Sequence, residues 1–231
     1  MTERRFLLRG LPDDGVVRLS ENIMQHVRVL RLAAGARVLL FDGAGKRAEA
    51  VLVDEEHARI ERIEHVASFR AVSVAVPILK GDRQDWLVEK LCELGCAALV
   101  PVTCERSVIN ELSEGKRARM ERIVEAACKQ SGRDDLMRIE PLVPLLCLAP
   151  RAPTVLSPSA AMLLSSVSGT AERLLVIGPE GGLTTVEETA LVAQGGSLAG
   201  LSGPILRAET AAIASLAIAS QTLRGVSAAE S

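Results

Sequence analysis

The pattern of hydrophobic and polar positions changes near residue 70. Before that point, short apolar segments bounded by turn residues predict β-strands, and one apolar stripe at helical spacing predicts a helix over residues 20–30 with Ser20 as its N-cap. The predicted strands cover residues 16–19, 37–41, 48–53 and 58–63. This pattern predicts a small β-rich domain over residues 1–70.

After residue 71 the pattern alternates between buried-type strands and amphipathic helices. Such alternation is typical of a parallel-sheet α/β domain, which we expect over residues 71–231. The predicted strands are 72–79, 97–102, 155–156, 174–177 and 197–201, and the predicted helices include 82–94, 113–131 and 208–223. Five prolines between Pro141 and Pro158 predict an irregular stretch, and residues 225–231 are expected to be a mobile tail.

An unusual turn, Gly178-Pro179-Glu180-Gly181-Gly182, joins the strand 174–177 to a helix. Its glycines allow positive φ and close approach of a ligand to the backbone. Thr184 and Thr185, with Glu187 and Glu188 three places on, each offer a capping box, so the helix start supplies free N–H groups. The turn is either a ligand-binding loop or only a tight connection.

A second loop of similar design, residues 201–211, follows the strand 197–201 and leads into the last helix. In open α/β sheets, ligands bind where loops at the carboxyl ends of neighbouring strands converge. We therefore expect residues 178–182 and 201–211 to line one pocket. No Gly-x-Gly-x-x-Gly and no Gly-x-x-x-x-Gly-Lys-Ser/Thr pattern follows a strand, which disfavours dinucleotides and nucleoside triphosphates.

The composition fits a globular protein of one large or two small domains, with 231 residues and an apolar fraction of 48%. No signal-peptide or membrane-spanning stretch is recognisable, so we expect a cytoplasmic protein without a membrane partner. The five cysteines form no Cys-x-x-Cys pair. We expect reduced thiols and no metal site, because no histidine lies near Cys92 and Cys96 in the sequence.

The net charge of −2 counts against a protein covered with nucleic acid, but the charge is unevenly distributed. Residues 1–47 hold nine basic and five acidic residues, followed by the acidic stretch Asp54-Glu55-Glu56. One face of the first domain could therefore meet phosphate while another is solvated. The alternative is a scatter of solvated arginines.

Several segments together resemble a known family. They are Lys90-Leu91-Cys92-Glu93-Leu94-Gly95 with Pro101 and Glu105-Arg106-Ser107; Gln130-Ser131-Gly132-Arg133; Ile177-Gly178-Pro179-Glu180-Gly181-Gly182; and Ile205-Leu206-Arg207-Ala208-Glu209-Thr210-Ala211. His26-Val27-Arg28-Val29-Leu30-Arg31 and Phe41-Asp42-Gly43 extend the match to the N-terminal part. The chain thereby resembles the bacterial small-subunit ribosomal RNA uridine N3-methyltransferases, which are knotted enzymes dependent on S-adenosylmethionine.

The resemblance implies a PUA-like β-barrel followed by an α/β domain with a deep trefoil knot. The knot loops would be residues 156–159, 178–182 and 201–206. S-adenosylmethionine would be held by Leu156, Ile177, Gly178, Pro179, Glu180, Gly181, Gly182, Leu201, Ser202, Gly203, Ile205, Leu206, Thr210 and Ala211. The implied partners are 16S ribosomal RNA or the small subunit and a second copy of the chain, paired through the C-terminal domain.

The implied reaction transfers a methyl group to N3 of a uracil ring, which must also lose its N3 proton. We expect Arg207 to stabilise negative charge on the base and Glu209 or Glu180 to take the proton. The RNA contacts are expected at Arg4, Arg9, Arg28, Arg31, Arg106, Gln130 and Arg133. Structural roles are the alternative: Arg207 could pair with either glutamate, and Glu209 could cap the last helix.

Two departures from the family pattern bear on these expectations. Leu201-Ser202-Gly203-Pro204 stands where the family usually has Leu-Gly-x-Arg, and Lys129 stands where it commonly has glutamate. A knotted methyltransferase acting on another RNA therefore remains an alternative. So does a catalytically silent RNA-binding assembly factor.

Overall fold

The computed structural model describes residues 4–66, 71–167 and 173–227, which form two compact units. The first unit combines residues 1–68 with residues 128–136, and the second combines residues 69–127 with residues 137–231. Segment 128–136 thus belongs to the first unit, which the sequence pattern did not predict. The expected boundary at residue 70 adjoins residues 67–70, which lie outside the described residues, and it stays a prediction.

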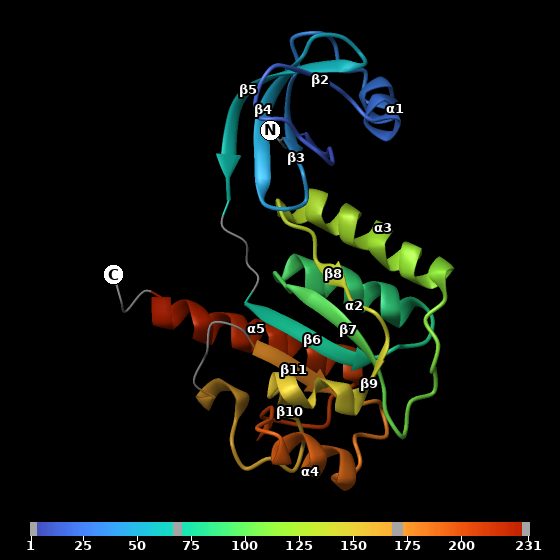
Figure 1. The fold of residues 1–231 in the computed structure, drawn as a ribbon, viewed down its shortest axis with the longest axis vertical. Helices are drawn as coiled ribbons and strands as arrows, with labels where there is room; N and C mark the ends of the chain where they lie inside the picture. Colours follow the sequence, from blue (N-terminus) through green and yellow to red (C-terminus); the bar gives the residue numbers. More distant parts are fainter. Residues whose placement is uncertain (1–3, 67–70, 168–172, 228–231) are drawn as a thin grey trace. The chain divides into compact units, whose positions relative to one another are not determined.

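The first unit is a strongly curled five-stranded sheet with one helix (Figure 1). Its elements are β1 (Arg5–Leu7), β2 (Val16–Arg18), α1 (Glu21–Val29), β3 (Arg37–Phe41), β4 (Lys46–Leu52) and β5 (His57–His65). The strand order is β1-β3-β4-β5-β2, with β1 parallel to β3 and the other pairs antiparallel.

Local pattern explains most of this unit. Ile23 and Val27 of α1 are buried in one core with Leu40 of β3 and Leu52 of β4, so the apolar stripe of the helix covers the sheet. The four expected strands and the expected helix are confirmed, and with them the β-rich, PUA-like class of the N-terminal part. Strand β1 was missed because it forms through its pairing with β3, which no local pattern indicates.

The second unit is built on a seven-stranded sheet in which every strand pair is parallel. Its strands are β6 (Val72–Pro77), β7 (Ala98–Thr103), β8 (Arg138–Ile139), β9 (Val143–Pro144), β10 (Thr154–Leu156), β11 (Arg173–Ile177) and β12 (Ser197–Ala199). The order is β12-β10-β11-β6-β7-β8, and β9 pairs with β7. The expected parallel α/β domain is confirmed.

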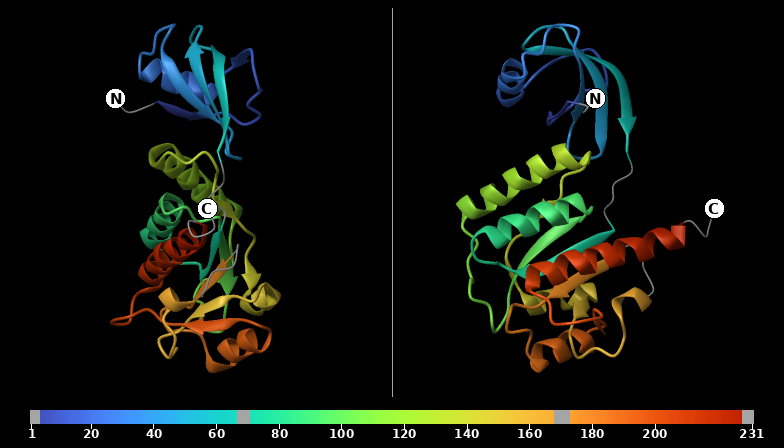
Figure 2. Two further views of the ribbon diagram at one scale, coloured as in Figure 1. Left: turned by 90° about the vertical axis from the view of Figure 1, so that its left-hand side faces the viewer. Right: turned by 180° about the vertical axis from the view of Figure 1, so that it is seen from behind.

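Helices cover both faces of this sheet, which is why every residue of β6 and β11 is buried. They are α2 (Asp82–Glu93), α3 (Glu114–Ser131), η1 (Leu145–Arg151), η2 (Leu164–Ser166), α4 (Thr185–Ala193) and α5 (Ala208–Ser227). Figure 2 shows α2 and α5 on one face, with η1 on the other. Because α5 continues to Ser227, the expected mobile tail is helical at its start, and residues 228–231 lie outside the described residues.

None of the described helices is long and apolar enough to cross a membrane.

Candidate functional site

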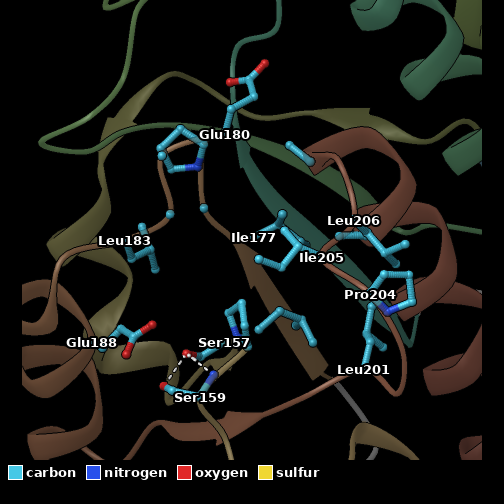
Figure 3. Close-up of a pocket in the computed structure, with 18 of the residues that line it drawn as sticks. Ser157, Ser159, Ile177, Glu180, Leu183, Glu188, Leu201, Pro204, Ile205 and Leu206 are labelled. Carbon is cyan, nitrogen blue, oxygen red and sulfur yellow. Dashed lines mark hydrogen bonds between the residues drawn. The ribbon is translucent and has the colours of Figure 1, made fainter.

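A pocket opens at the carboxyl ends of three neighbouring strands. Leu156 at the end of β10 lies opposite Ile177 of β11 and Ala199 of β12, so the three strands end at the same level. The loops that follow them enclose a cavity of about 460 Å³ (Figure 3). This volume is in the range of small-molecule sites. The convergence of two strand-end loops on one pocket, expected from the sequence, is what the structure shows.

Most residues expected to hold a cofactor line this cavity. They are Leu156, Ile177, Gly178, Pro179, Glu180, Gly181, Gly182, Leu201, Gly203, Ile205, Leu206 and Ala211. Ser202 and Thr210 are exposed and are not among the lining residues. The lining also includes the expected loop positions Ser157, Pro158, Ser159, Pro204 and Ala208, and three residues not expected there, Leu183, Thr185 and Glu188. Which of them touch a ligand stays a prediction.

Gly178 is the glycine that the loop geometry requires most. A Cβ atom at this position would lie 2.9 Å from the Leu183 backbone nitrogen and 3.2 Å from the Gly182 carbonyl carbon, both backbone atoms. Gly182 closes the same turn by donating its N–H to the Pro179 carbonyl at 2.8 Å, with a φ of 70°. The sequence showed three glycines here but not which of them is constrained by contact.

The loop after β7 is attached both to this turn and to the first turn of α4. The Arg106 Nη1 atom donates to the Gly181 carbonyl at 2.5 Å. The buried Glu187 carboxylate accepts from the Glu105 N–H at 2.8 Å and from the Thr184 N–H at 2.8 Å. Thr184 in turn accepts from the Glu187 N–H, which confirms the capping box at this pair. Arg106, expected to contact RNA, therefore also fixes the pocket wall.

Two of the three expected catalytic residues are brought together by Arg83, a residue of α2 that the sequence analysis did not single out. Its Nη1 atom lies 2.7 Å from Glu180 Oε1 and 3.7 Å from Glu209 Oε2. A backbone hydrogen bond and the Arg83 guanidinium lower the pKa of the Glu180 carboxyl, and the same contact raises the pKa of Arg83.

Glu209 and Arg207 differ in their surroundings. Glu209 is buried in the first turn of α5, and within the described part of the chain its Oε2 atom has no hydrogen-bond partner. Arg207 is exposed, and no partner for its guanidinium is found in the same described residues. The arginine that pairs with both glutamates is Arg83 rather than Arg207, because α2 brings its first turn to the pocket rim. No signal along the sequence links these three segments.

The residues expected to contact RNA are of two kinds. Arg4, Arg9, Arg31 and Gln130 are exposed. Arg133, by contrast, is only 6% exposed and its Nη2 atom lies 3.1 Å from Asp135 Oδ2. Arg133 thus has a structural partner inside the first unit.

The expected separation of a basic face from the acidic stretch 54–56 does not hold for two arginines. Arg28 pairs with Glu55 at 3.1 Å and Arg18 with Glu56 at 3.4 Å. The turn between β4 and β5 brings these carboxylates to the arginines of α1 and β2, so part of the local positive charge is neutralised within the unit.

The wall of the pocket is acidic rather than basic. Among the described residues that line it, Glu180 and Glu188 are the charged ones, and none is lysine, arginine or histidine. Neither do the described residues contain a group of three histidine, cysteine, aspartate or glutamate side chains that could hold a metal ion.

Comparison with known proteins places these features in one family. A family model described as an RNA methyltransferase domain matches residues 67–220, and one described as an RNA methyltransferase PUA domain matches residues 19–61. The chain is 31% identical to the ribosomal RNA small subunit methyltransferase E of Synechocystis sp., with 82% of this chain and 67% of that protein covered. The chain belongs to the ribosomal RNA small subunit methyltransferase E family.

Other members of the methyltransferase E family agree over nearly the whole chain. The Bacillus subtilis protein is 29% identical, with 89% of this chain and 90% of that protein covered. The crystal structure of the Neisseria gonorrhoeae protein bound to S-adenosyl methionine has a TM-score of 0.85 and 31% identity, with 96% of this chain and 98% of that chain covered. The family resemblance stated from sequence is confirmed.

Proposed function

We propose that the protein transfers the methyl group of S-adenosylmethionine to N3 of a uridine in 16S ribosomal RNA of the small ribosomal subunit. The observation that carries the proposal is the pocket at the carboxyl edge of β10, β11 and β12, which is lined by glycine and apolar residues and carries acidic but no basic side chains. An acidic wall suits a cation and disfavours phosphate groups. Family membership supports the same assignment.

The residues present fit S-adenosylmethionine. Bound there, it would supply a methyl group already activated by the sulfonium. The backbone groups of residues 178–182, together with Leu201, Ile205 and Leu206, would hold the adenosine. The main task of the protein is then to hold methyl donor and uracil at attack distance, an effect worth up to roughly 7–11 kcal/mol.

The N3 proton requires an acceptor, and the two candidate glutamates are not equal. Glu180 is paired with Arg83 and its lowered pKa makes it a weak base. Glu209 is buried and keeps an oxygen without a hydrogen-bond partner among the described residues. Arg83 lies 3.7 Å from this oxygen, beyond hydrogen-bond distance, whereas it lies 2.7 Å from Glu180, and we therefore assign proton acceptance to Glu209. Arg207, which is exposed and lies between the lining residues Leu206 and Ala208, would stabilise negative charge on the base.

RNA recognition is assigned to the first unit and to Arg106. N3 of uracil is hidden in a base pair, so the target must be unpaired or flipped out. The exposed Arg4, Arg9, Arg31 and Gln130 would contact the RNA backbone. We further propose that residues 1–70 form the RNA-binding domain and residues 71–231 the methyltransferase domain. The loops of the pocket would form a trefoil knot, and two copies of the chain would pair through the C-terminal unit. The protein would act in the cytoplasm.

Mass mapping of modified nucleosides tests this function. Small-subunit RNA from a strain lacking the gene should lack one 3-methyluridine, and the purified protein with S-adenosylmethionine should restore it. Unaltered 3-methyluridine in the deletion strain would overturn the assignment to this nucleoside. Calorimetry that detects no binding of S-adenosylmethionine would favour a catalytically silent assembly factor.

A further inference from the structure

The two acidic residues on the pocket wall, Glu180 and Glu188, differ in the direction of their side chains and in their partners. Glu180 points away from the cavity in Figure 3, and Arg83 lies 2.7 Å from its carboxylate. Glu188 points from α4 into the cavity and is half-buried. No cation pairs with Glu188 among the residues that the structure describes. The pocket therefore contains one negative charge that no cationic side chain of the described residues neutralises.

Helix capping does not account for the Glu188 carboxylate. The sequence offered it as half of a capping box with Thr185, but the cap forms between Thr184 and Glu187. Glu188 lies in the first turn of α4, where the helix dipole favours a carboxylate, and its backbone N–H donates to the Thr184 carbonyl at 3.0 Å, but its side chain makes no capping hydrogen bond. Its side chain is left free to face the cavity.

The side of the cavity near Glu188 is polar. Ser157 and Ser159 lie on the same side, with their hydroxyl groups 2.9 Å apart, and Leu183 is an apolar neighbour there, whereas Leu201 and Leu206 lie opposite (Figure 3). The cavity thus has an anionic, hydroxyl-lined end and an apolar end. S-adenosylmethionine has the complementary division, with a sulfonium, an ammonium and a carboxylate in its methionine half, which is positive overall, and a flat adenine in the other.

We propose that Glu188 faces the positively charged methionine half of S-adenosylmethionine and is a specificity-determining residue for that cofactor. The inference rests on the proposed function. A half-buried carboxylate without a cation is unfavourable, and a bound cation relieves that cost. Glu188 therefore favours charged ligands over neutral ones with the same adenosine, and the apolar end receives the adenine.

Calorimetry with three ligands on the full chain tests the proposal. S-adenosylmethionine carries a sulfonium together with the ammonium and carboxylate of its amino-acid end, S-adenosylhomocysteine carries only the ammonium and carboxylate, and 5′-methylthioadenosine carries none of the three. Glu188→Gln should weaken S-adenosylmethionine by about tenfold, as expected for one lost charge interaction, and leave 5′-methylthioadenosine unchanged. Glu188→Asp should recover part of the loss. Glu121→Gln, with the same loss of charge on α3 outside the pocket, should change none of the three affinities.

Each outcome decides a separate question. If only S-adenosylmethionine is weakened, Glu188 faces the sulfonium; if S-adenosylhomocysteine is weakened equally, it faces the ammonium. Equal weakening of all three ligands, or no effect on any, would overturn the proposal. If the wild-type chain binds none of them, the proposed function itself fails. Thermal melting of each variant shows whether the fold is retained.

Discussion

The two glycine-containing walls of the pocket differ in the number of hydrogen bonds and ion pairs that attach them to the rest of the protein. The first wall, residues 178–182, is attached from three directions, by Arg83 through Glu180, by Arg106 through Gly181, and by the turn that Gly182 closes. The second wall, residues 201–206, makes no hydrogen bond to another segment within the part of the chain that the structure describes. Ile205 in this wall is 87% exposed.

This difference indicates how the site works. A wall fixed by the protein is ready before the ligand arrives, which lowers the cost of binding. A wall with an exposed isoleucine gains its contacts only when a ligand covers it. We therefore expect the first wall to set the position of the cofactor, and the second wall to close over it.

The largest effect is expected from Gly178→Ala in the first wall. The added methyl group would lie 2.9 Å from the Leu183 backbone nitrogen, so the turn itself must shift. Such crowding costs about 1–3 kcal/mol of folding free energy. A displaced turn misplaces the cofactor, and a shift of about 1 Å can cost about 100-fold in rate. Methyl transfer to small-subunit RNA and thermal melting measure the two effects.

Gly115→Ala provides the matched control. A Cβ atom added at Gly115, near the start of α3, would have no other atom within 4 Å, and the backbone at this position does not have a positive φ. This variant should keep full activity and gain at most about 1 kcal/mol in stability. Similar losses in both variants would show that the tight turn at Gly178 has no special role.

The next largest effect is expected from Glu187→Ala. The change removes the acceptor for the Thr184 and Glu105 N–H groups, and with it the link between the loop after β7 and the start of α4, while the Arg106–Gly181 bond to the first wall remains. The free energy of unfolding should fall by about 2 kcal/mol, which lowers the melting temperature by about 4–8 °C. Thr185→Ala, one residue past the cap, should change the free energy of unfolding by less than about 0.5 kcal/mol. Equal losses in these two variants would contradict the assigned cap.

Arg83→Met should have a smaller, pH-dependent effect. The pKa of Glu180 is lowered in the folded state, partly by Arg83, so this interaction stabilises the fold above the ordinary pKa of a glutamate and is lost as the pH falls through the folded value. Wild type should be more stable than the variant at neutral pH, and the difference should shrink in acid. Melting curves across this range test the prediction. A stability difference that does not change with pH would indicate lost packing instead. Arg83→Lys, which keeps the positive charge, should retain most of the pH-dependent stabilisation.

The features of these two walls that depend on neighbouring residues could be predicted from the sequence, and those that depend on tertiary contacts could not. The helix cap at Thr184 and the buried strand β11 were predictable because a cap and a strand pattern lie within a few neighbouring residues. Convergence of the two loops was predictable because parallel strands end at one edge of the sheet. Arg83 was not predictable, because its role depends on α2 meeting the loop after β11 and the start of α5.

The same reasoning explains the misses in the first unit. Strand β1 exists through its pairing with β3, and segment 128–136 belongs to this unit through tertiary contacts such as the Arg5–Asp134 ion pair at 2.5 Å. Arg133 was expected to contact RNA from its motif; the fold gives it Asp135 as a partner, and its contact with RNA stays a prediction. A motif identifies a residue as unusual; only the fold shows whether its side chain faces solvent or a partner.

The smallest effect on the free protein is expected from Ile205→Ser in the second wall. Because this side chain is 87% exposed, its loss should change the free energy of unfolding by less than about 0.5 kcal/mol. If the second wall closes over the adenosine, Ile205 is buried in the complex, and its removal should weaken S-adenosylmethionine by roughly three- to tenfold. Melting of the free variant and calorimetry with the cofactor separate the two effects. A large loss of stability without cofactor would mean that this wall is packed before binding, and the contrast between the two walls would disappear.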